Sequence, residues 1–432
     1  MSWRISLVLA TAAIPLGCHE PASAPPFFEP ALPDRELWSG GEIRVTVPAF
    51  ANTTAIVLLG SDTLTYRLAD ETTLVARLPR RAGAFPVRVV AGKLAASLGN
   101  VTLHGFQAAY FGPIMSGQPY WIPAGAPLVF AGSDVGAALV DLRTSTPVVS
   151  LPAALHSPDC IWSPSPSYRS DRFVLLGKAA DGTCGVPKLW SITSSPQLLD
   201  SIACCSYTWY TSGQPSDRRW IFNWNNHNYF YNCDSVPCAQ RYFASADGPS
   251  GVTISQRGDR FLWLPADQPV VFDSKTLDTA FVLPQFGGLY GAFSFEGDTL
   301  AVTAGDSANH VHVLAVRATD GTIVHDLEVD SVIPLPRYRG WSSVAFDPTR
   351  PWLYALIFRF GDSTWVPTLL VLDRSTWSPV GVLDVPEGKI PGMFAAFAIV
   401  PSPLEHGVYL VNAVNGYSMH SYHAVITRFS TP

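Results

Sequence analysis

The fold is decided by one stretch near the C-terminal end: Ser343-Val-Ala-Phe346, Leu353-Tyr-Ala-Leu-Ile357, Thr368-Leu-Leu-Val-Leu-Asp373 and Val380-Gly-Val-Leu383. These apolar runs are separated by residues that favour turns, among them Asp347-Pro348 and Ser375-Thr376. Short apolar runs bounded by Gly, Pro, Asp or Ser are typical of antiparallel β-strands. The stretch therefore predicts one sheet of four strands.

The same unit recurs along most of the chain. A turn rich in Gly, Asp or Pro leads into an apolar strand at Leu128, Phe173, Trp220, Phe261, Leu300, Leu353 and Val408. The mean spacing is (408 − 128)/6, about 47 residues, and a period of roughly 40 to 50 with β-type segments is typical of β-propeller blades. The 37 prolines interrupt any helical pattern. The chain is therefore predicted to be all-β, with a seven-bladed β-propeller over residues 106–432.

Two further expectations concern individual blades. The third strand is weakest in blades two and three, where we place it at residues 189–192 and 242–243. Blade seven shows three apolar runs, at residues 394–400, 408–413 and 424–429. We expect residues 101–111 to supply its fourth strand, because closing the ring in this way protects the sheet edge.

Residues 39–105 precede the propeller and predict a smaller β domain. Six short strands are expected there, which fits a small immunoglobulin-like sandwich. They lie at Glu42–Val47, Thr54–Leu58, Leu64–Leu68, Thr73–Arg77, Phe85–Val90 and Leu98–Leu103.

Two resemblances to known families follow from these segments. Residues 76–89, with a Pro, then Ala-Gly, then a Pro-Val-Arg-Val strand, resemble the end of an IPT/TIG-like immunoglobulin domain, which implies a spacer or adhesive module. The repeat unit, as in Phe346-Asp-Pro348 followed by Leu353-Tyr354, resembles YVTN-type and lactonase-type bacterial propellers.

The N-terminus resembles a bacterial lipoprotein signal peptide. Arg4 precedes an apolar stretch from Ile5 to Ala13, and Leu16-Gly17-Cys18 resembles the cleavage and lipidation site. This resemblance implies that residues 1–17 are removed and that Cys18 carries a lipid. Residues 18–38, rich in proline, then form a tether. The alternative is an ordinary secretory signal. Either way we expect the protein to be exported. If Cys18 carries a lipid, we expect the protein to be anchored to the outer membrane, at its periplasmic face or at the cell surface.

Six cysteines remain after Cys18, an even number that agrees with disulfides in an oxidising compartment. They are Cys160, Cys184, Cys204, Cys205, Cys233 and Cys238. The short spacing of Cys233 and Cys238 predicts a disulfide across a hairpin, whereas the other pairings stay open. Zinc binding is the alternative for this set, although two separated CxxC pairs are absent.

Charge and aromatic content indicate which classes of partner the protein is expected to bind. With 28 basic and 34 acidic residues and no long basic run, the chain is not expected to bind nucleic acid, and we expect a monomer. Aromatic residues concentrate in blade three and predict a face that stacks a glycan or a peptide. The candidates are Trp209, Trp220, Trp224, Tyr229 and Tyr231, and packing inside the blade is the alternative.

Candidates for metal binding are few. His310 and His312 alternate along a strand, and Asp171, Asp217, Asp259 and Asp298 occupy corresponding turns of four blades, where they could ring the channel mouth. The alternatives are a solvated strand face for the histidines and turn formation for the aspartates. No cofactor is predicted, and a divalent cation in the channel stays an open alternative.

Two classes of function follow. The first is an exported, lipid-anchored propeller that binds a protein or glycan at the cell surface, with no catalysis. The second is an exported hydrolase, lactonase-like, or a quinone-type oxidoreductase, whose site is assembled in the central channel from several blades without a local motif. The sequence contains no GxSxG, HExxH, P-loop or GxGxxG motif.

Overall fold

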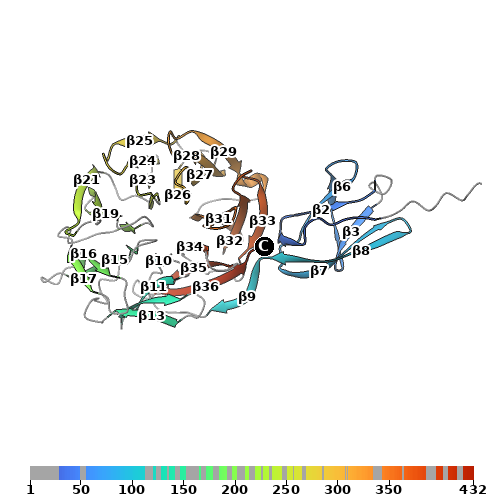
Figure 1. Ribbon diagram of the computed structural model, residues 1–432, viewed down its shortest axis with the longest axis horizontal. Coiled ribbons are helices and arrows are strands. Elements are labelled where there is room, and N and C mark those ends of the chain that lie inside the picture. The colour runs from blue at the N-terminus through green and yellow to red at the C-terminus, as the bar shows by residue number, and fades with distance from the viewer. Residues whose placement is uncertain are drawn as a thin grey trace, which may run out of the picture.

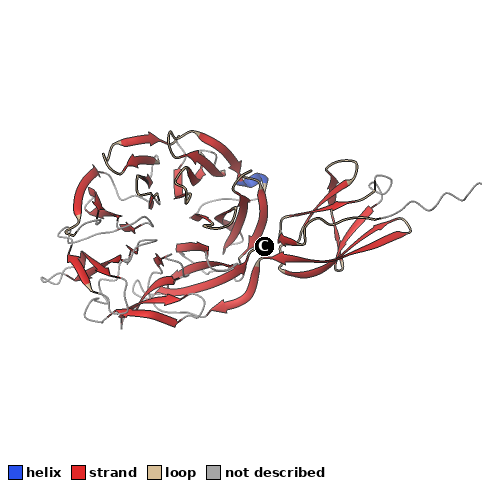
Figure 2. Cartoon of the chain, viewed as in Figure 1, coloured by secondary structure: helices blue, strands red, loops and turns tan. Residues whose placement is uncertain are grey.

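The computed structural model describes most strands of the 432-residue chain and part of the loops. Described are residues 29–48, 55–111, 120–122, 128–133, 136–141, 146–151, 165–166, 172–178, 184–191, 197–201, 210–213, 219–224, 227–232, 236–245, 251–255, 257–264, 269–284, 287–306, 308, 310–333, 343–361, 364–385, 396–401, 407–415 and 422–432. Figures 1 and 2 show a ring of sheets with a smaller β domain beside it.

Seven four-stranded antiparallel sheets, the blades, form the ring. In chain order their strands are β10 (Tyr120–Ile122), β11 (Leu128–Ser133), β12 (Gly136–Asp141), β13 (Thr146–Leu151); β14 (Ser165–Pro166), β15 (Arg172–Lys178), β16 (Cys184–Ser191), β17 (Leu198–Ser201); β18 (Tyr210–Gly213), β19 (Arg219–Trp224), β20 (His227–Asn232), β21 (Ala239–Ser245); β22 (Gly251–Ile254), β23 (Arg260–Leu264), β24 (Val270–Asp273), β25 (Thr279–Val282); β26 (Gly287–Phe293), β27 (Thr299–Gly305), β28 (Val311–Arg317), β29 (Ile323–Glu328); β30 (Ser343–Phe346), β31 (Trp352–Gly361), β32 (Thr364–Asp373), β33 (Pro379–Asp384); and β34 (Ala396–Pro401), β35 (Gly407–Asn415), β36 (Tyr422–Ser430) with β9 (Phe106–Phe111). The first strands of neighbouring blades contact one another around the ring, and β34 returns to β10. The predicted seven-bladed propeller is confirmed.

The expected strand positions hold in most blades. The second strand of every blade begins at the predicted residue or one residue before it. Blade three is the exception to the third-strand prediction, because its third strand is β20 and residues 242–243 lie in the fourth strand, β21. That prediction was wrong because β20 begins and ends with polar residues, His227 and Asn232, and its aromatic centre is too short to be recognised as a strand in the sequence.

Blade seven is closed by a strand from the other end of the propeller. β9 pairs antiparallel with β36, with Thr427 opposite Tyr110 and Ile426 opposite Phe111. This confirms the expected closure. The first described strand of the propeller and the last one thus lie in the same sheet.

The smaller domain consists of two sheets that enclose one apolar core. One sheet has the order β1 (Glu36–Trp38), β8 (Leu94–His104), β7 (Gly83–Ala91), β3 (Ala55–Leu59), β4 (Asp62–Leu64), and the other has β2 (Glu42–Thr46), β6 (Thr73–Arg77), β5 (Tyr66–Leu68). Along β2 the burial alternates, with Ile43 and Val45 buried between exposed neighbours, as a half-buried strand requires. Ile43, Val57, Leu74, Val87 and Val101 meet in the core.

Two details of this domain differ from the sequence analysis. The single strand expected at Leu64–Leu68 is two strands, β4 and β5, which belong to different sheets. Residues 36–38, which we placed in the tether, form β1 and pair parallel with β8. Only three residues long, β1 has too short an apolar pattern to be recognised in the sequence.

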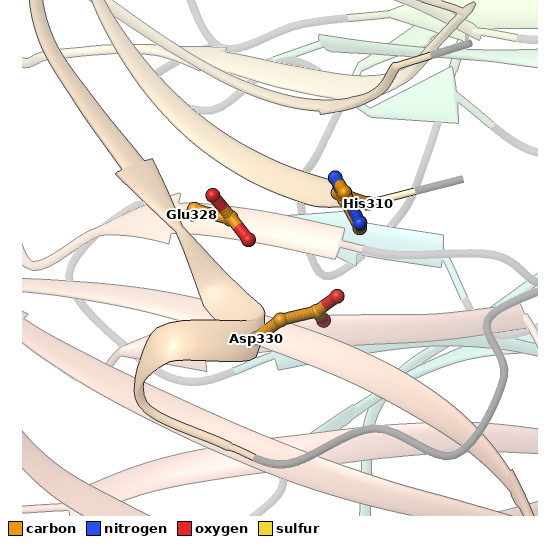
Figure 3. A group of neighbouring side chains, drawn as sticks. All are labelled: His310, Glu328 and Asp330. Atoms are coloured by element: carbon orange, nitrogen blue, oxygen red, sulfur yellow. The ribbon is translucent and has the colours of Figure 1, made fainter. Parts of the chain in front are cut away.

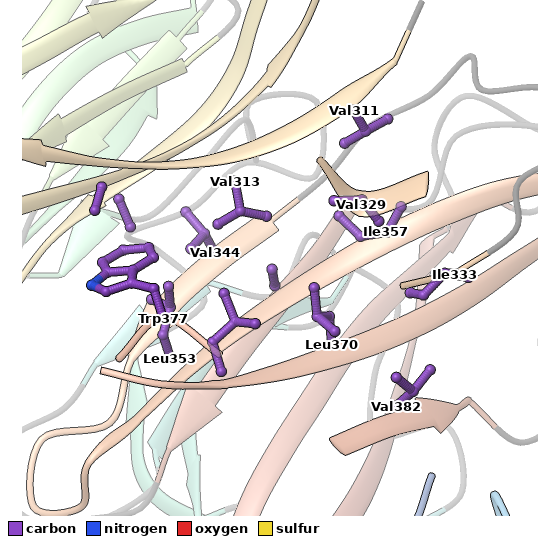
Figure 4. Packing of buried hydrophobic residues seen from close by; sticks show 14 of the residues in the cluster. Val311, Val313, Val329, Ile333, Val344, Leu353, Ile357, Leu370, Trp377 and Val382 are labelled. Atoms are coloured by element: carbon purple, nitrogen blue, oxygen red, sulfur yellow. The ribbon is translucent and has the colours of Figure 1, made fainter. Parts of the chain in front are cut away.

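A buried apolar cluster lies between blades five and six of the propeller (Figure 4). Val313 from β28, Val344 from β30 and Leu353 from β31 are buried in one cluster, and Val329 joins them from η4, a 3-10 turn at Val329–Ser331. Apolar side chains from both blades interdigitate there, so the two sheets are held at a fixed separation.

Trp38 joins the two domains. It is 3% exposed, and its ring lies edge-on against Trp352, Tyr354 and Phe429 of blades six and seven, with centroids 6.0, 6.4 and 6.0 Å away. The backbone N–H of Val382 donates to the carbonyl oxygen of Ser39 over 3.2 Å. The sandwich is therefore attached to the propeller by packing and by a backbone bond.

Close backbone approach at this junction requires glycine. A Cβ at Gly40 or Gly41 would overlap the carbonyl oxygens of Val382 and Val380, and Gly40 also has φ +68°. Arg80 pairs with Asp384 at 3.0 Å nearby. A cleft of about 760 Å³ remains between the domains.

Among the described residues, no helix is long and apolar enough to cross a bilayer.

Candidate functional site

A group of potential metal ligands lies in blade five. His310 directly precedes β28, Glu328 ends β29, and Asp330 lies in η4. Each offers one ligand atom, and these atoms all lie within 4.8 Å of one another. Figure 3 shows the three side chains converging on a common space. An imidazole and two carboxylates at this separation could hold a divalent cation.

The backbone that carries these ligands is fixed by burial. Each of the three is adjacent in sequence to a buried valine, Val311 beside His310 and Val329 between Glu328 and Asp330. These two valines are 1% and 0% exposed, and Ile333, three residues after Asp330, is also 0% exposed. The ligand positions are thus set by the core between blades five and six.

Asp306 orients the imidazole of His310. Its Oδ2 lies 3.1 Å from Nδ1 of His310, and since a carboxylate only accepts, Nδ1 is the donor and Nε2 remains for a metal. The backbone N–H of His310 donates to Oδ1 of Asp306 over 2.7 Å and lowers the pKa of that carboxyl. A carboxylate behind a ligating histidine is a common second layer of metal sites.

His312 lies near Asp306 as well, but its hydrogen bond goes to Asp326. Its Nδ1 lies 2.7 Å from Oδ1 of Asp326, and its Nε2 lies 3.7 Å from Oδ2 of Asp306. The histidine pair predicted from the sequence is therefore split, since His310 joins the ligand group and His312 does not. His325, on β29, stacks on Trp377 at 5.8 Å.

Asp330 has an unusual environment within the group. Burial raises the pKa of its carboxyl, with the charge of Glu328 acting in the same direction and His310 opposing it. Its Oδ1 is buried, and none of the described residues donates a hydrogen bond to it. A buried carboxylate oxygen without a donor is costly unless a cation or water compensates it.

A second candidate surface is formed by aromatic residues of blade three. Tyr229 of β20 lies opposite Tyr242 of β21 in the sheet register, and their rings meet edge-on at 5.8 Å. Tyr242 is 52% exposed. Arg241, beside it, donates to the carbonyl oxygens of Lys275 and Thr276, the latter at 3.2 Å, and so fixes β21 against blade four.

The other predicted members of this aromatic face have different placements. Tyr231 is 1% exposed, so it belongs to the blade interior, and burial raises the pKa of its hydroxyl. Trp220 and Trp224 lie in β19, but their side chains are outside the described part, as is all of Trp209. The burial of Tyr231 agrees with the alternative of packing inside the blade, since strand alternation alone does not tell which face is covered by the next blade.

Comparisons with known proteins add the following. The sequence matches no family model and no curated protein. A solved structure, the beta-propeller domain of Myceliophteria thermophila Cps50 (Swd1), is similar in shape with a TM-score of 0.49. It is 13% identical, and the match covers 73% of this chain and 97% of that one. The assignment of the propeller given above depends on the seven sheets themselves.

Two of the four aspartates predicted to ring the channel are described. Asp259 accepts from the hydroxyl of Ser255 over 2.6 Å, and Asp298 accepts from the hydroxyl of Ser294 over 2.8 Å. Burial raises the pKa of Asp298, but hydrogen bonds from Ser294 and Thr299 outweigh it and hold that pKa below its usual value. These bonds agree with the turn-forming alternative. Asp171 and Asp217 lie outside the described residues.

Of the cysteines, Cys238 is disulfide-bonded. Its predicted partner Cys233 lies outside the described residues, so this pairing stays a prediction. Cys184 belongs to β16 with its side chain undescribed, and Cys18, Cys160, Cys204 and Cys205 lie outside the described part.

The sequence analysis missed the carboxylates of blade five. Asp306 lies four residues before His310, and Glu328 and Asp330 are separated by one residue. This acid-and-histidine spacing was the available signal. What brings Glu328 and Asp330 near His310 is the pairing of β28 with β29, in which His312 lies opposite Glu328.

Proposed function

We propose that the protein is an exported, lipid-anchored binding module whose propeller takes a glycan ligand on blade three. The observation that carries the proposal is the exposed Tyr242 ring, held edge-on against Tyr229 on neighbouring strands. Propellers commonly serve as binding scaffolds, although fold alone does not assign a ligand.

Aromatic rings on a sheet face suit a sugar ligand. A tyrosine offers a broad apolar face that packs on the C–H groups of a pyranose, and its hydroxyl can bond to the sugar hydroxyls. Arg241 ties β21 to blade four, so we expect little conformational entropy to be lost when a ligand binds there. Tyr242 therefore supplies contact area at low cost.

Binding of the full-length protein to a printed glycan array tests this directly. Tyr242→Ala should weaken the strongest glycan interaction about tenfold, since loss of one stacked ring costs roughly 1.4 kcal/mol. Tyr242→Phe, which keeps the ring, should retain most of the affinity. Val282→Ala, which truncates an apolar side chain 45% exposed on the outer strand of blade four, is the control. An array without binding, or equal binding by Tyr242→Ala and the unchanged protein, contradicts the proposal.

Anchoring is tested separately. The proposal places a lipid on Cys18, within Leu16-Gly17-Cys18. Cys18→Ala should move the protein from the membrane fraction to the soluble fraction of fractionated cells, while Cys238→Ala should leave its membrane association unchanged. Unaltered partitioning of the Cys18 variant would show that no lipid is attached there.

A further inference from the structure

We propose that His310, Glu328 and Asp330 bind a first-row transition-metal ion, with zinc as its most suitable occupant, and that this ion stabilises the blade-five side of the junction with the sandwich. This blade-five cation site does not depend on the glycan proposal. It lies where β28 begins and β29 ends, at the third and fourth strands of its blade, and therefore away from the first strands that line the channel.

The arrangement of the ligands supports a site formed before the ion arrives. Their ligand atoms already lie within 4.8 Å of one another, so an ion at their centre needs only small side-chain adjustments (Figure 3). Buried Val311 and Val329 fix the backbone next to each ligand. Sites on rigid elements bind tightly because little ordering is needed.

One ligand of the group, the half-buried Asp330, carries an oxygen that lacks a donor in the described part of the chain. Oδ1 of Asp330 is buried and receives no hydrogen bond from any residue in the described ranges. The carboxylate of Glu328 has no proton to donate to this oxygen. Nε2 of a neutral His310 has none either, because Nδ1 carries the ring proton. A bound cation would compensate this oxygen where the protein supplies no donor.

The donor set selects the kind of ion. Calcium and magnesium prefer oxygen ligands throughout, whereas an imidazole together with carboxylates suits zinc and other first-row ions. Asp306 behind His310 supplies the outer carboxylate that such histidine ligands usually have. Three protein ligands leave a fourth position of a tetrahedral zinc site for water.

The same turn that holds Asp330 continues into the domain junction. The carbonyl oxygen of Val332, two residues later, accepts a hydrogen bond from the guanidinium of Arg77 in the sandwich over 3.2 Å. An ion that holds Asp330 and Glu328 together therefore restrains η4, and with it the acceptor of Arg77. Zinc should slow amide hydrogen exchange across residues 329–333.

The test is zinc binding to the full-length, untagged protein after chelator treatment and dialysis, measured by isothermal titration calorimetry together with elemental analysis. We expect one zinc ion for each chain at this site, and much weaker binding of calcium and magnesium. His310→Gln, Glu328→Gln and Asp330→Asn should each weaken zinc binding at least tenfold or remove one equivalent. They should also abolish the zinc-dependent rise in melting temperature and the slowed exchange of residues 329–333.

Two control variants distinguish this site from adventitious binding. His325→Gln removes an imidazole three residues before Glu328 that stacks on Trp377, and Glu296→Gln removes an exposed carboxylate paired with Arg374 at 2.7 Å. Both should bind zinc like the unchanged protein. Equal zinc binding by all variants, or no zinc binding by the unchanged protein, overturns the proposal. Calcium binding as tight as zinc binding that survives His310→Gln overturns the assignment of the ion.

Discussion

Asp347 shows how one buried carboxylate organises a turn in blade six. It is 0% exposed and accepts from the backbone N–H groups of Thr349 and Arg350 at 3.0 and 2.9 Å. Its other oxygen accepts from Nε of Arg350 and from the hydroxyl of Tyr354, both at 2.8 Å. The Phe346-Asp-Pro348 motif thus has a physical role, because its aspartate ties the first-strand turn to the second strand.

Removing this carboxylate should be among the most destabilising single changes. Asp347→Ala removes the carboxylate that pairs with Arg350, whose side chain is 11% exposed and keeps its bond to the hydroxyl of Thr431, and it removes the acceptor of the buried Tyr354 hydroxyl. We expect the free energy of unfolding to fall by about 3 kcal/mol or more, measured by urea denaturation. Tyr354→Phe, which removes a single donor, should cost about 1 kcal/mol. Similar losses in the two variants would contradict this role of the ion pair.

The turns between third and fourth strands follow one geometry in blades four, five and six. Leu277, Gly321 and Trp377 occupy equivalent positions with φ of 63°, 77° and 56°, and each donates its backbone N–H to the residue four before it. Asp273 and Asp373 accept backbone N–H groups within two of these turns. The hairpin requires a residue with positive φ at this position. In blades four and six that residue carries a side chain, Leu277 and Trp377.

Gly321 should not tolerate a side chain, although its equivalents carry one. A Cβ at Gly321 would lie 2.6 Å from the ring of Phe281 in blade four, in addition to the left-handed φ. We expect Gly321→Ala to cost about 2 kcal/mol or more, measured by calorimetric melting. Gly92, with φ +61° and open space around it, is the matched control, and Gly92→Ala should cost about 1 kcal/mol. A larger loss at Gly92 than at Gly321 would show that contact with Phe281 is unimportant.

How far the sequence could predict these elements depends on how local their causes are. The second strands, such as the one beginning at Leu353, were located well because a Gly-Asp or Asp-Pro turn and an apolar run lie side by side in the chain. The separation of β4 from β5 at Thr65 was not foreseeable, because two strands in different sheets can share one apolar pattern. The grouping of His310 with Glu328 and Asp330 was likewise missed, since it depends on strand register.

At the scale of the whole molecule, the sandwich and the propeller share one apolar junction. Trp38 belongs to the same buried cluster as Tyr354, Leu410 and Phe429 of blades six and seven. Arg80 with Asp384 and the backbone bond from Val382 to Ser39 reinforce the contact. Packing of this kind couples the stabilities of two domains.

Trp38→Ala should separate the unfolding of the two domains. Loss of the indole removes packing worth about 3 to 5 kcal/mol, so one calorimetric transition should become two. Trp38→Phe keeps an aromatic ring at the junction and should leave a single transition at a lower temperature. Two transitions in the unchanged protein would mean that the junction does not couple the domains.

The pairing of β9 with β36 has a consequence for how the protein is made. β9 ends at Phe111, and its partner begins at Tyr422, so the final hydrogen bonds of the ring join segments synthesised far apart in time. The sandwich, whose contacts are local, can fold while the ribosome is still translating the blades. β9 directly follows its last strand, β8, and so is in place before β36 is synthesised. A chain cut short before residue 422 would keep a folded N-terminal domain and an open ring, exposed to proteases until it is degraded. The closing pair can therefore form only after Tyr422–Ser430 has been synthesised.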